Sequence, residues 1–513
     1  MLNRLLGWGT DGHGDARVIR TMGCHEGYQT AMHTLDQYRG TIVACRYSLP
    51  RSLAPSHALK TLQSKVCNAV AHIALAQPHL QTGIVGENSP APAFVRLDRL
   101  DLSNHVYWIL CQDSSDLEKR YQESVETELD SRYSNLDTQP GWRVVILKAA
   151  DAESIEVLYV WNHPHHDGMS GKIFHEQLLQ SLHGEPVNGT EPPTPQFHPD
   201  STSWILDLPD SSALLPPPPE ILTSFTISPP FFVKYLWKEL KPYSLFPDTA
   251  HALWAPVHLT PFKTRLQTFV VNGDTVNKLV DVCHKYGTTI TALFQALVLV
   301  SLAPLLGDMK GFASRTPYNL RQILPSKPAK YPWVEPKDSM CNYVSVMEHE
   351  FDTSVVTQIR SQIPDKSTGI SLSPGLLDIV WSVAARIRGE IKARLDSGVR
   401  NDVLPIMRLV YDWRTQQESE ARKPRYLSWL VTNLGVVDGG GSEKRQDPER
   451  WAIRKADLLL SAEVPSAALS VSLMTVKDEE MCVSCTWQDC ALEGSLVEHL
   501  MDDLKRWVDE IAS

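Results

Sequence analysis

Alternating apolar and polar residues identify one strand–turn–helix unit in the first third of the chain. Residues 155–161 alternate and include β-branched and aromatic side chains, which predicts a strand with one or both faces buried. From Ser170 or Gly171 to His183 apolar residues recur at helical spacing, and Gly184 is a suitable C-terminal stop. We therefore expect a strand and a helix joined by a tight turn whose polar side chains face a cleft.

The same periodicities predict strands and helices along the rest of the chain. The predicted strands lie at 41–48, 93–98, 105–111, 143–148, 266–272, 427–434, 467–475 and 480–487. The predicted helices lie at 56–76, 116–132, 231–240, from Asp274 or Thr275 to Gly287, from Thr288 or Thr289 to 303, and at 375–397 and 493–511. Helices and strands in alternation indicate a layered α/β fold.

The periodic pattern disappears between residues 184 and 262, where prolines become frequent. Such a composition is typical of a semi-rigid connection between two folded parts. We therefore predict an N-terminal lobe at 1–184, whose first 17 residues form a loose arm, a proline-rich crossover at 185–262, and a C-terminal lobe at 263–513.

Composition narrows the functional classes. The 513 residues are 42% hydrophobic, which is enough for two substantial cores. A net charge of -11 and the lack of a basic stripe argue against nucleic acid as a partner. The nine cysteines are scattered and odd in number, so we expect reduced, mostly buried thiols. The apolar run 290–306 is interrupted by polar residues and proline, which favours a buried helix over a membrane span. No secretion signal is recognisable, so we expect a cytoplasmic protein. We also expect a monomer.

Candidate chemistry lies in the turn after the strand 155–161. His163 and Asp167 form an H-x-x-x-D pair, and Gly168 lets the backbone turn into the helix. A histidine can accept a proton from a hydroxyl near neutral pH, and the aspartate can hold the turn in shape. The alternative is a structural turn that is merely polar. A metal site built from His163, His165, His166 and His175 is less favoured, because the spacing matches no known metal motif, and we expect no metal.

These residues resemble the active-site motif of the BAHD and condensation-domain superfamily of acyltransferases, and in particular its fungal alcohol acetyltransferase branch. Four further segments are similar to that branch and keep its order: Arg20–His33, Gln77–Leu80, Pro317–Arg321 and Thr432–Gly435. The resemblance spans roughly residues 18–510. It implies an α/β fold of two chloramphenicol-acetyltransferase-like lobes with mixed sheets and a channel between them.

The resemblance also implies roles for single residues. His163 would be the general base between an acyl thioester and an alcohol, which enter the channel from opposite sides. Asp167 would pair with an arginine: Arg321 is our first choice and Arg46 the second, although either could be an ordinary surface or interlobe arginine. Gly168 N–H is a candidate donor to the oxyanion, and Asn433 could line the channel or simply satisfy a strand edge.

Two departures from the superfamily patterns refine the assignment. Asn162 occupies the place where condensation domains often have a first histidine, which favours the alcohol acetyltransferase branch. The D-F-G-W-G signature of plant BAHD enzymes is absent, and the glycine loop 437–441 is not its equivalent. The absence argues against a plant-type enzyme and leaves the contacts to the acyl donor unlocated.

The expected activity is acyl-CoA-dependent O-acylation, with acetyl-CoA as co-substrate and no bound cofactor. The expected acceptor is a hydroxylated small molecule of secondary metabolism, such as a terpenoid or polyketide-type compound. Two alternatives remain: a condensation-like enzyme that takes the acyl group from a carrier-protein thioester, and a non-catalytic binder of an apolar metabolite. N-acylation also remains open, because a histidine base serves an amine equally well.

Overall fold

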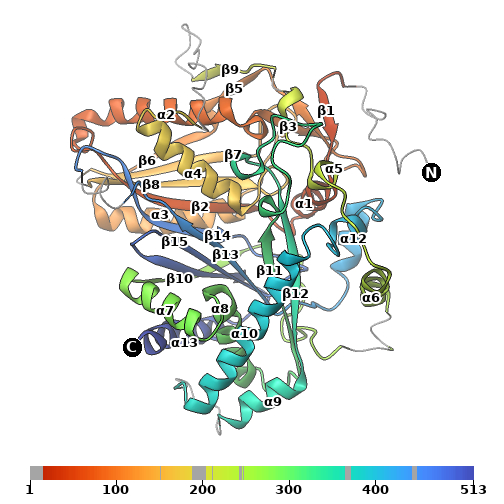
Figure 1. Ribbon diagram of the computed structural model, residues 1–513. Helices are drawn as coiled ribbons and strands as arrows, with labels where there is room; N and C mark the ends of the chain where they lie inside the picture. Colours follow the sequence, from red (N-terminus) through yellow and green to blue (C-terminus); the bar gives the residue numbers. More distant parts are fainter. Residues whose placement is uncertain are drawn as a thin grey trace.

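Two mixed β-sheets form the centres of two lobes (Figure 1). The computed structural model describes residues 15–150, 152–187, 204–210, 212–241, 245, 248–363, 371–441 and 447–513. The expected N-terminal arm is therefore described only from residue 15, and residues 188–203 of the expected crossover lie outside the described residues.

The first lobe is built on a five-stranded sheet in the order β14–β2–β8–β7–β6. Its strands are β14 (Ala452–Leu460), β2 (Gly40–Ser48), β8 (Ser154–Asn162), β7 (Trp142–Ala149) and β6 (Val106–Cys111). Only the β6–β7 pair is parallel. Helices α2 (Leu59–Ala76) and α4 (Gly168–Leu182) cover one face, and α3 (Ser114–Asp130) covers the other. Strand β8 is buried along nearly its whole length because both faces of the sheet are covered.

The second lobe is built on a six-stranded sheet in the order β10–β16–β15–β13–β11–β12. Its strands are β10 (Thr264–Val271), β16 (Met481–Gln488), β15 (Leu469–Val476), β13 (Trp429–Val437), β11 (Phe312–Asn319) and β12 (Val344–Phe351). The pairs β11–β13 and β13–β15 are parallel, and the others are antiparallel. Its core is completed by α7 (Gly273–Lys285), α8 (Ile290–Leu305), α10 (Pro374–Asp396) and α13 (Gly494–Ala512).

Helix α8 explains the longest apolar stretch of the sequence. It is apolar on all sides because it lies inside the second core, and Thr289 caps it by accepting from Ala292 N. No single helix of the described ranges is long and apolar enough to cross a membrane. The pair α7–α8 meets that criterion only when its two members are taken together, and they are bent by 89°.

Strand β14 connects the lobes. It comes from the C-terminal half of the chain, yet it pairs antiparallel with β2 in the first sheet, from Ala452 opposite Ser48 to Leu460 opposite Thr41. Ser484 of β16 donates to both carboxylate oxygens of the buried Asp457, at 2.8 and 3.0 Å. The predicted lobes, divided at residues 184 and 262, did not include a C-terminal strand in the first sheet. That the predicted lobes are separate folding units stays a prediction.

Most helices and strands lie where the sequence pattern predicted them. The differences are one helix cap and several elements that the pattern missed. The cap of α7 is Asn272, whose side chain accepts from Thr275 N, so the predicted cap at Asp274 or Thr275 was wrong. The periodicity also missed helix α1 (Cys24–Thr34) and the strands β11, β12 and β14. In the crossover, α6 spans Pro229–Leu240. All nine cysteines are free, and seven are buried.

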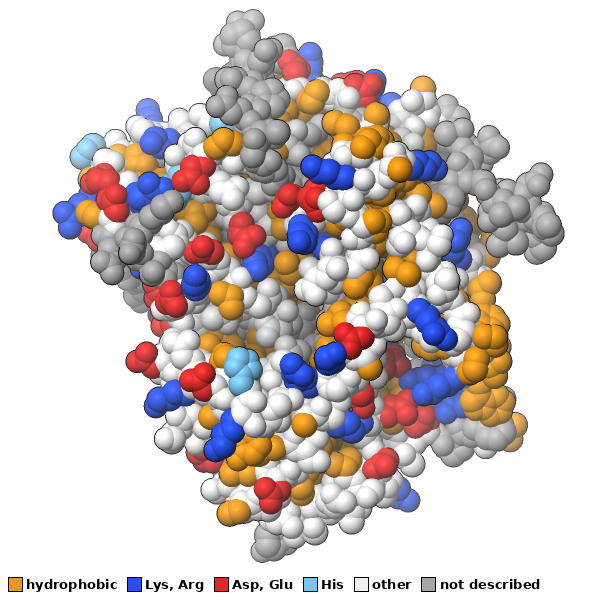
Figure 2. All heavy atoms as spheres, viewed as in Figure 1, with side chains coloured by type: hydrophobic (Ala, Val, Ile, Leu, Met, Phe, Trp, Pro, Cys, Tyr) orange, Lys and Arg blue, Asp and Glu red, His pale blue; other side chains and the backbone are white. Residues whose placement is uncertain are grey.

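The exposed surface carries both signs of charge. On the face drawn in Figure 2, lysines and arginines lie interspersed with aspartates and glutamates and form no continuous basic stripe.

Candidate active site

The H-x-x-x-D turn lies between the end of β8 and the start of α4. Strand β8 ends at Asn162, and α4 begins at Gly168 with Asp167 as its N-cap. One oxygen of Asp167 accepts from the backbone N–H and from the hydroxyl of Ser170, each at 2.9 Å. The aspartate therefore fixes the helix start in the usual way for a capping side chain.

The other contacts of Asp167 come from the second lobe. Arg321 donates to both of its carboxylate oxygens, at 2.5 and 3.0 Å, and both side chains are only 2% exposed. The backbone N–H of Tyr343 donates to the same carboxylate at 2.9 Å. Of the two arginines considered from sequence, Arg321 is thus the partner, whereas Arg46 forms an ion pair with Glu156 on the first sheet.

Arg321 and Ser170 also bind the chain segment 339–343. Arg321 donates to the carbonyl oxygens of Ser339 and Cys341, each at 3.0 Å. The Ser170 hydroxyl donates to the Cys341 carbonyl at 2.9 Å and accepts from the Cys341 N–H at 3.0 Å. The turn of the first lobe is therefore joined to the second lobe through side chains whose polar groups are satisfied, as a buried charge requires.

The pair stays ionised in spite of its burial. Burial alone would raise the pKa of Asp167, but the charge of Arg321 and the hydrogen bonds from Arg321 and Ser170 outweigh it and hold this pKa below its usual value. Burial opposes the charge of Arg321 as well, and Asp167 more than compensates, so the arginine pKa is raised. A carboxyl with a depressed pKa contributes stability above its ordinary pKa and loses that contribution as the pH falls through the depressed value.

Among the described residues, the ring of His163 has a hydrogen-bonding neighbour on its Nδ1 side only. Asn342 Nδ2 donates to the His163 carbonyl oxygen at 2.7 Å and lies 3.4 Å from Nδ1. Nε2 has no hydrogen-bond partner among the described residues, so this side of the ring is open to a substrate.

His163 is neutral at physiological pH. Burial lowers its pKa below the ordinary 6.5, although its own carbonyl and the nearby Asp167 act in the opposite direction. A neutral ring with a free Nε2 can accept a proton. The rings of His25 and Tyr38 lie against it, with centroids at 5.9 and 5.7 Å. The Tyr38 hydroxyl is bonded elsewhere, to Thr41 at 2.7 Å.

The other histidines of the cluster have separate partners in the core. His165 contacts Asn162 Oδ1 at 2.6 Å and the Thr82 carbonyl at 3.1 Å, and His166 contacts the Tyr159 hydroxyl at 3.1 Å. His175 lies between the Tyr47 hydroxyl and the Val43 carbonyl, each at 2.9 Å. Across the part of the chain that the structure describes, no three His, Cys, Asp or Glu residues are grouped to hold a metal ion.

The two remaining predicted site residues, Gly168 and Asn433, have different surroundings. Gly168 begins α4, and a Cβ there would meet Leu434 of β13 at 3.0 Å, so the two lobes approach closely at this point. The Asn433 amide is used locally: it accepts from Gly435 N at 2.7 Å and donates to Thr291 Oγ1 at 3.1 Å. These bonds shape the irregularity in β13, and a contact of Asn433 with substrate stays a prediction.

The chain is similar to known proteins of one kind, fungal alcohol acetyltransferases. A family model described as Alcohol acetyltransferase matches residues 112–334, the stretch that contains His163, Asp167 and Arg321. Probable alcohol acetyltransferase FCK4 of Fusarium pseudograminearum is 27% identical, with 96% of each chain covered. Probable alcohol acetyltransferase crmB of Aspergillus fumigatus is 23% identical, with 95% of this chain and 99% of the relative covered. The chain is therefore similar to fungal alcohol acetyltransferases along nearly its whole length.

These similarities support an acyltransferase. Solved structures agree on its fold. TRI3 trichothecene 15-O-acetyltransferase from Fusarium sporotrichioides superposes with a TM-score of 0.70 at 12% identity, covering 98% of this chain and 97% of that one. The first condensation domain of the calcium-dependent antibiotic synthetase gives 0.58 at 12% identity, covering 96% and 95%. The fold is thus the two-lobed, chloramphenicol-acetyltransferase-like one expected from sequence.

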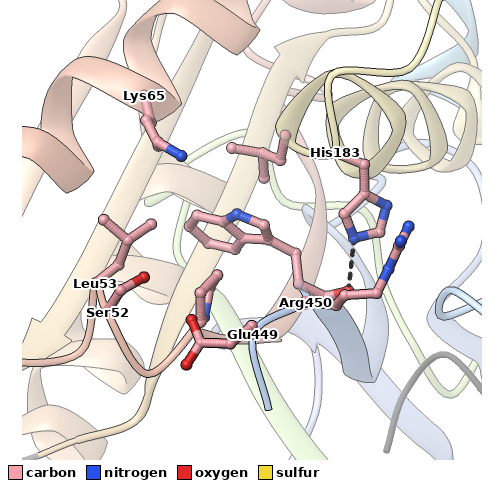
Figure 3. Close-up of a pocket in the computed structure, with 9 residues that line it drawn as sticks. Ser52, Leu53, Lys65, His183, Glu449 and Arg450 are labelled. Atoms are coloured by element: carbon pink, nitrogen blue, oxygen red, sulfur yellow. Dashed lines mark hydrogen bonds between the residues drawn. The ribbon is translucent and has the colours of Figure 1, made fainter. Parts of the chain in front are cut away.

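A surface pocket lies at the C-terminal end of α4, next to His183 (Figure 3). It has a volume of about 210 Å³ and surrounds the C-terminal end of α4, where His183 bonds to the Trp451 carbonyl at 3.0 Å. The 15 residues of α4 separate it from the catalytic turn, a distance of about 22 Å at 1.5 Å per residue. The pocket is therefore not part of the candidate site. It is lined by Pro50, Ser52, Leu53, Lys65, Leu182, His183, Glu449, Arg450 and Trp451.

Several residues of the candidate site could not be singled out from sequence. Asn342, which holds His163, follows no recognisable motif. Ser170 could have been predicted from its position, because a hydroxyl three residues after a helix-capping aspartate can donate to the same carboxylate as its backbone N–H. His25 lies in the segment that resembled the family opening, but nothing in its spacing pointed to His163.

Replacing Asp167 tests the ion pair that joins the lobes. Asp167→Asn leaves the buried Arg321 without a counter-charge, and we expect the free energy of unfolding to fall by about 3–5 kcal/mol at pH 7. The difference from wild type should shrink as the pH falls through the depressed Asp167 pKa, because the wild-type carboxylate is then protonated as well.

Urea unfolding from pH 7 down to pH 3 measures this effect. Lys392→Ala is the matched control, since the side chains of Lys392 and Asp396 are each 62% exposed and their surface pair should contribute about 0–1 kcal/mol. Equal losses in the two variants would contradict the interpretation of Asp167–Arg321 as the ion pair on which the interlobe contact depends.

Proposed function

We propose that the protein is an acyl-CoA-dependent O-acyltransferase that transfers acetyl from acetyl-CoA to a hydroxyl of a small, natural-product-like alcohol. The observation that carries this proposal is the state of His163. Its ring is neutral, its Nδ1 side faces Asn342, and its Nε2 has no partner among the described residues. These are the properties of a general base.

The reaction balances without a covalent enzyme intermediate. Nε2 of His163 takes the proton of the alcohol while the alcohol oxygen forms a bond to the thioester carbonyl carbon. The tetrahedral intermediate then collapses, the carbon–sulfur bond breaks, and the imidazolium returns the proton to the CoA thiolate. Proton transfer of this kind contributes about 10²–10⁴-fold in rate, and alignment of the two substrates can contribute as much again.

Asp167 acts at a distance from this chemistry. Its carboxylate is directed to Arg321, Ser170 and Tyr343, and no oxygen is left over for the ring of His163. Its role in the proposal is to fix the turn that carries the base and to favour the imidazolium that forms during the reaction. In the proposed arrangement the two substrates reach His163 from opposite sides, between the lobes.

The choice of acetyl and alcohol rests on the relatives. Both fungal proteins are described as probable alcohol acetyltransferases, and the solved structure of similar fold is a trichothecene 15-O-acetyltransferase. Condensation domains share the fold as well, so a carrier-protein thioester is the competing donor. A melting temperature that rises saturably with acetyl-CoA supports the CoA donor, whereas no rise favours the carrier protein.

Replacing His163 tests the proposed base. We expect His163→Ala to fold normally, because the ring makes few hydrogen bonds, and to lose about 10²–10⁴-fold in turnover. The measurement is CoA release from acetyl-CoA with a panel of hydroxylated terpenoids and simple alcohols. His72→Ala, a change on α2 outside the site, is the control and should keep the wild-type rate.

Thiol release that needs both an alcohol and His163 establishes the acyltransferase mechanism. A His163→Ala protein that turns over at the wild-type rate would contradict it.

The pH dependence follows from the lowered pKa of His163. Only the neutral ring accepts a proton, so kcat/KM should rise with pH through this pKa and then level off. Because burial lowers the pKa, the midpoint should lie below 6.5. A profile recorded with acetyl-CoA and a simple alcohol between pH 4 and 8 measures it, and a midpoint above 7 would mean that another group limits the rate.

A further inference from the structure

Helix α1 is fixed at its N-terminus by a buried ion pair. Arg20 donates to both oxygens of Glu26, at 2.7 and 2.8 Å, and the Glu26 side chain is only 4% exposed. Glu26 also accepts from the backbone N–H of Gly23 at 2.6 Å, which satisfies a free donor ahead of the helix. The arginine, glycine and glutamate that resembled the family opening therefore set the start of α1.

Close contacts fix the position of the same helix. A Cβ on Gly23 would come within 2.4 Å of Pro218, and the Cys24 N–H donates to Glu220 at 2.8 Å. A Cβ on Gly27 would lie 3.2 Å from Trp413. Because these neighbours leave no room, α1 has little freedom to shift relative to the crossover segment.

This rigid helix places His25 beside the candidate base. The His25 and His163 rings lie edge to face, with centroids 5.9 Å apart and planes at 73°. His25 is 9% exposed, and its other aromatic contact is Tyr28 at 5.8 Å. Two imidazole rings from different parts of the chain thus meet at one point.

His25 remains neutral throughout the physiological range. Burial, followed by the proximity of His163, lowers the pKa of His25 to about 3. Such a ring is too weak a base to replace His163, but a neutral imidazole always carries one N–H donor. Gln29 Nε2 approaches His25 Nε2 in a long contact of 3.5 Å, and as a donor it favours the tautomer with the proton on Nδ1. Nδ1 has no partner among the described residues.

We propose that His25 is a second catalytic residue, whose Nδ1–H donates a hydrogen bond to the thioester carbonyl oxygen as that oxygen becomes an oxyanion. This inference rests on the proposed acyltransferase function and adds a role to the same site. No proton leaves His25; it stays neutral while His163 carries the transferred proton. A fixed donor in a buried site stabilises a developing charge without reorganisation, and one such donor typically contributes about 10²–10³-fold to kcat.

The other candidate donors fit this assignment. The Asn433 amide, considered from sequence, is bonded to Gly435 and Thr291. Gly168 is the first residue of α4, so its N–H has no partner within the helix and can act together with His25. In this proposal, helix α1 positions the neutral His25 ring beside His163, so that its N–H can donate to the oxyanion.

Paired substitutions isolate the N–H group. His25→Phe keeps a ring but removes the donor, and we expect kcat to fall by about 10²-fold or more with little change in the KM for acetyl-CoA. His25→Gln keeps a side-chain N–H and should recover part of that loss. Both are measured on acetyl-CoA hydrolysis without alcohol and on transfer to the most active alcohol of the panel, with melting temperatures as the check on folding. His72→Phe serves as the control and should behave as wild type.

The outcomes separate this inference from the proposed function. A large loss in His25→Phe on both reactions, partly recovered in His25→Gln, supports the oxyanion role. A normal kcat in His25→Phe overturns it, and so does an increase confined to the KM of the alcohol, which would make His25 an acceptor contact. In both of those cases a loss of activity in His163→Ala leaves the acyltransferase proposal standing. Wild-type activity in His163→Ala overturns that proposal instead.

Discussion

The buried ion pair between Asp167 and Arg321 joins the two lobes directly behind the turn that carries His163. An isolated charge at this depth would be costly, and each partner here is satisfied by the other and by the Ser170 and 339–343 groups around it. The contact fixes the start of α4 and brings the 339–343 segment, with Asn342, alongside His163. Positioning of the base therefore depends on an interaction that neither lobe could form alone.

Near this ion pair, burial lowers the pKa values of two histidines, His163 and His25, to different extents. His163 is buried enough to be neutral at pH 7, yet its carbonyl and Asp167 limit the decrease in its pKa, so it can still accept a proton. His25 is neutral over a wider pH range because burial and the neighbouring His163 both lower its pKa. In the proposed mechanism one ring therefore moves a proton, and the other only donates a hydrogen bond.

Local pattern was sufficient to predict β8, α4 and the H-x-x-x-D turn, because alternation and helical spacing are properties of short segments. The Asp167–Arg321 pairing came from family resemblance. Strand β14 was not foreseen because its place beside β2 depends on a register between residues 400 positions apart, and its burial does not alternate. The contacts of Asn342 and His25 with His163 likewise arise only when distant segments pack together.

The central claim is that the acetyl group passes directly from the thioester to the alcohol with His163 as base. The most direct measurement is a single turnover with isotopically labelled acetyl-CoA and the best alcohol of the panel, followed by intact-protein mass spectrometry and product analysis. The account predicts that the label appears in the ester while the protein stays unlabelled, and that His163→Ala forms the ester far more slowly. Labelled acetyl on the protein, or ester formation at the wild-type rate in His163→Ala, would contradict it.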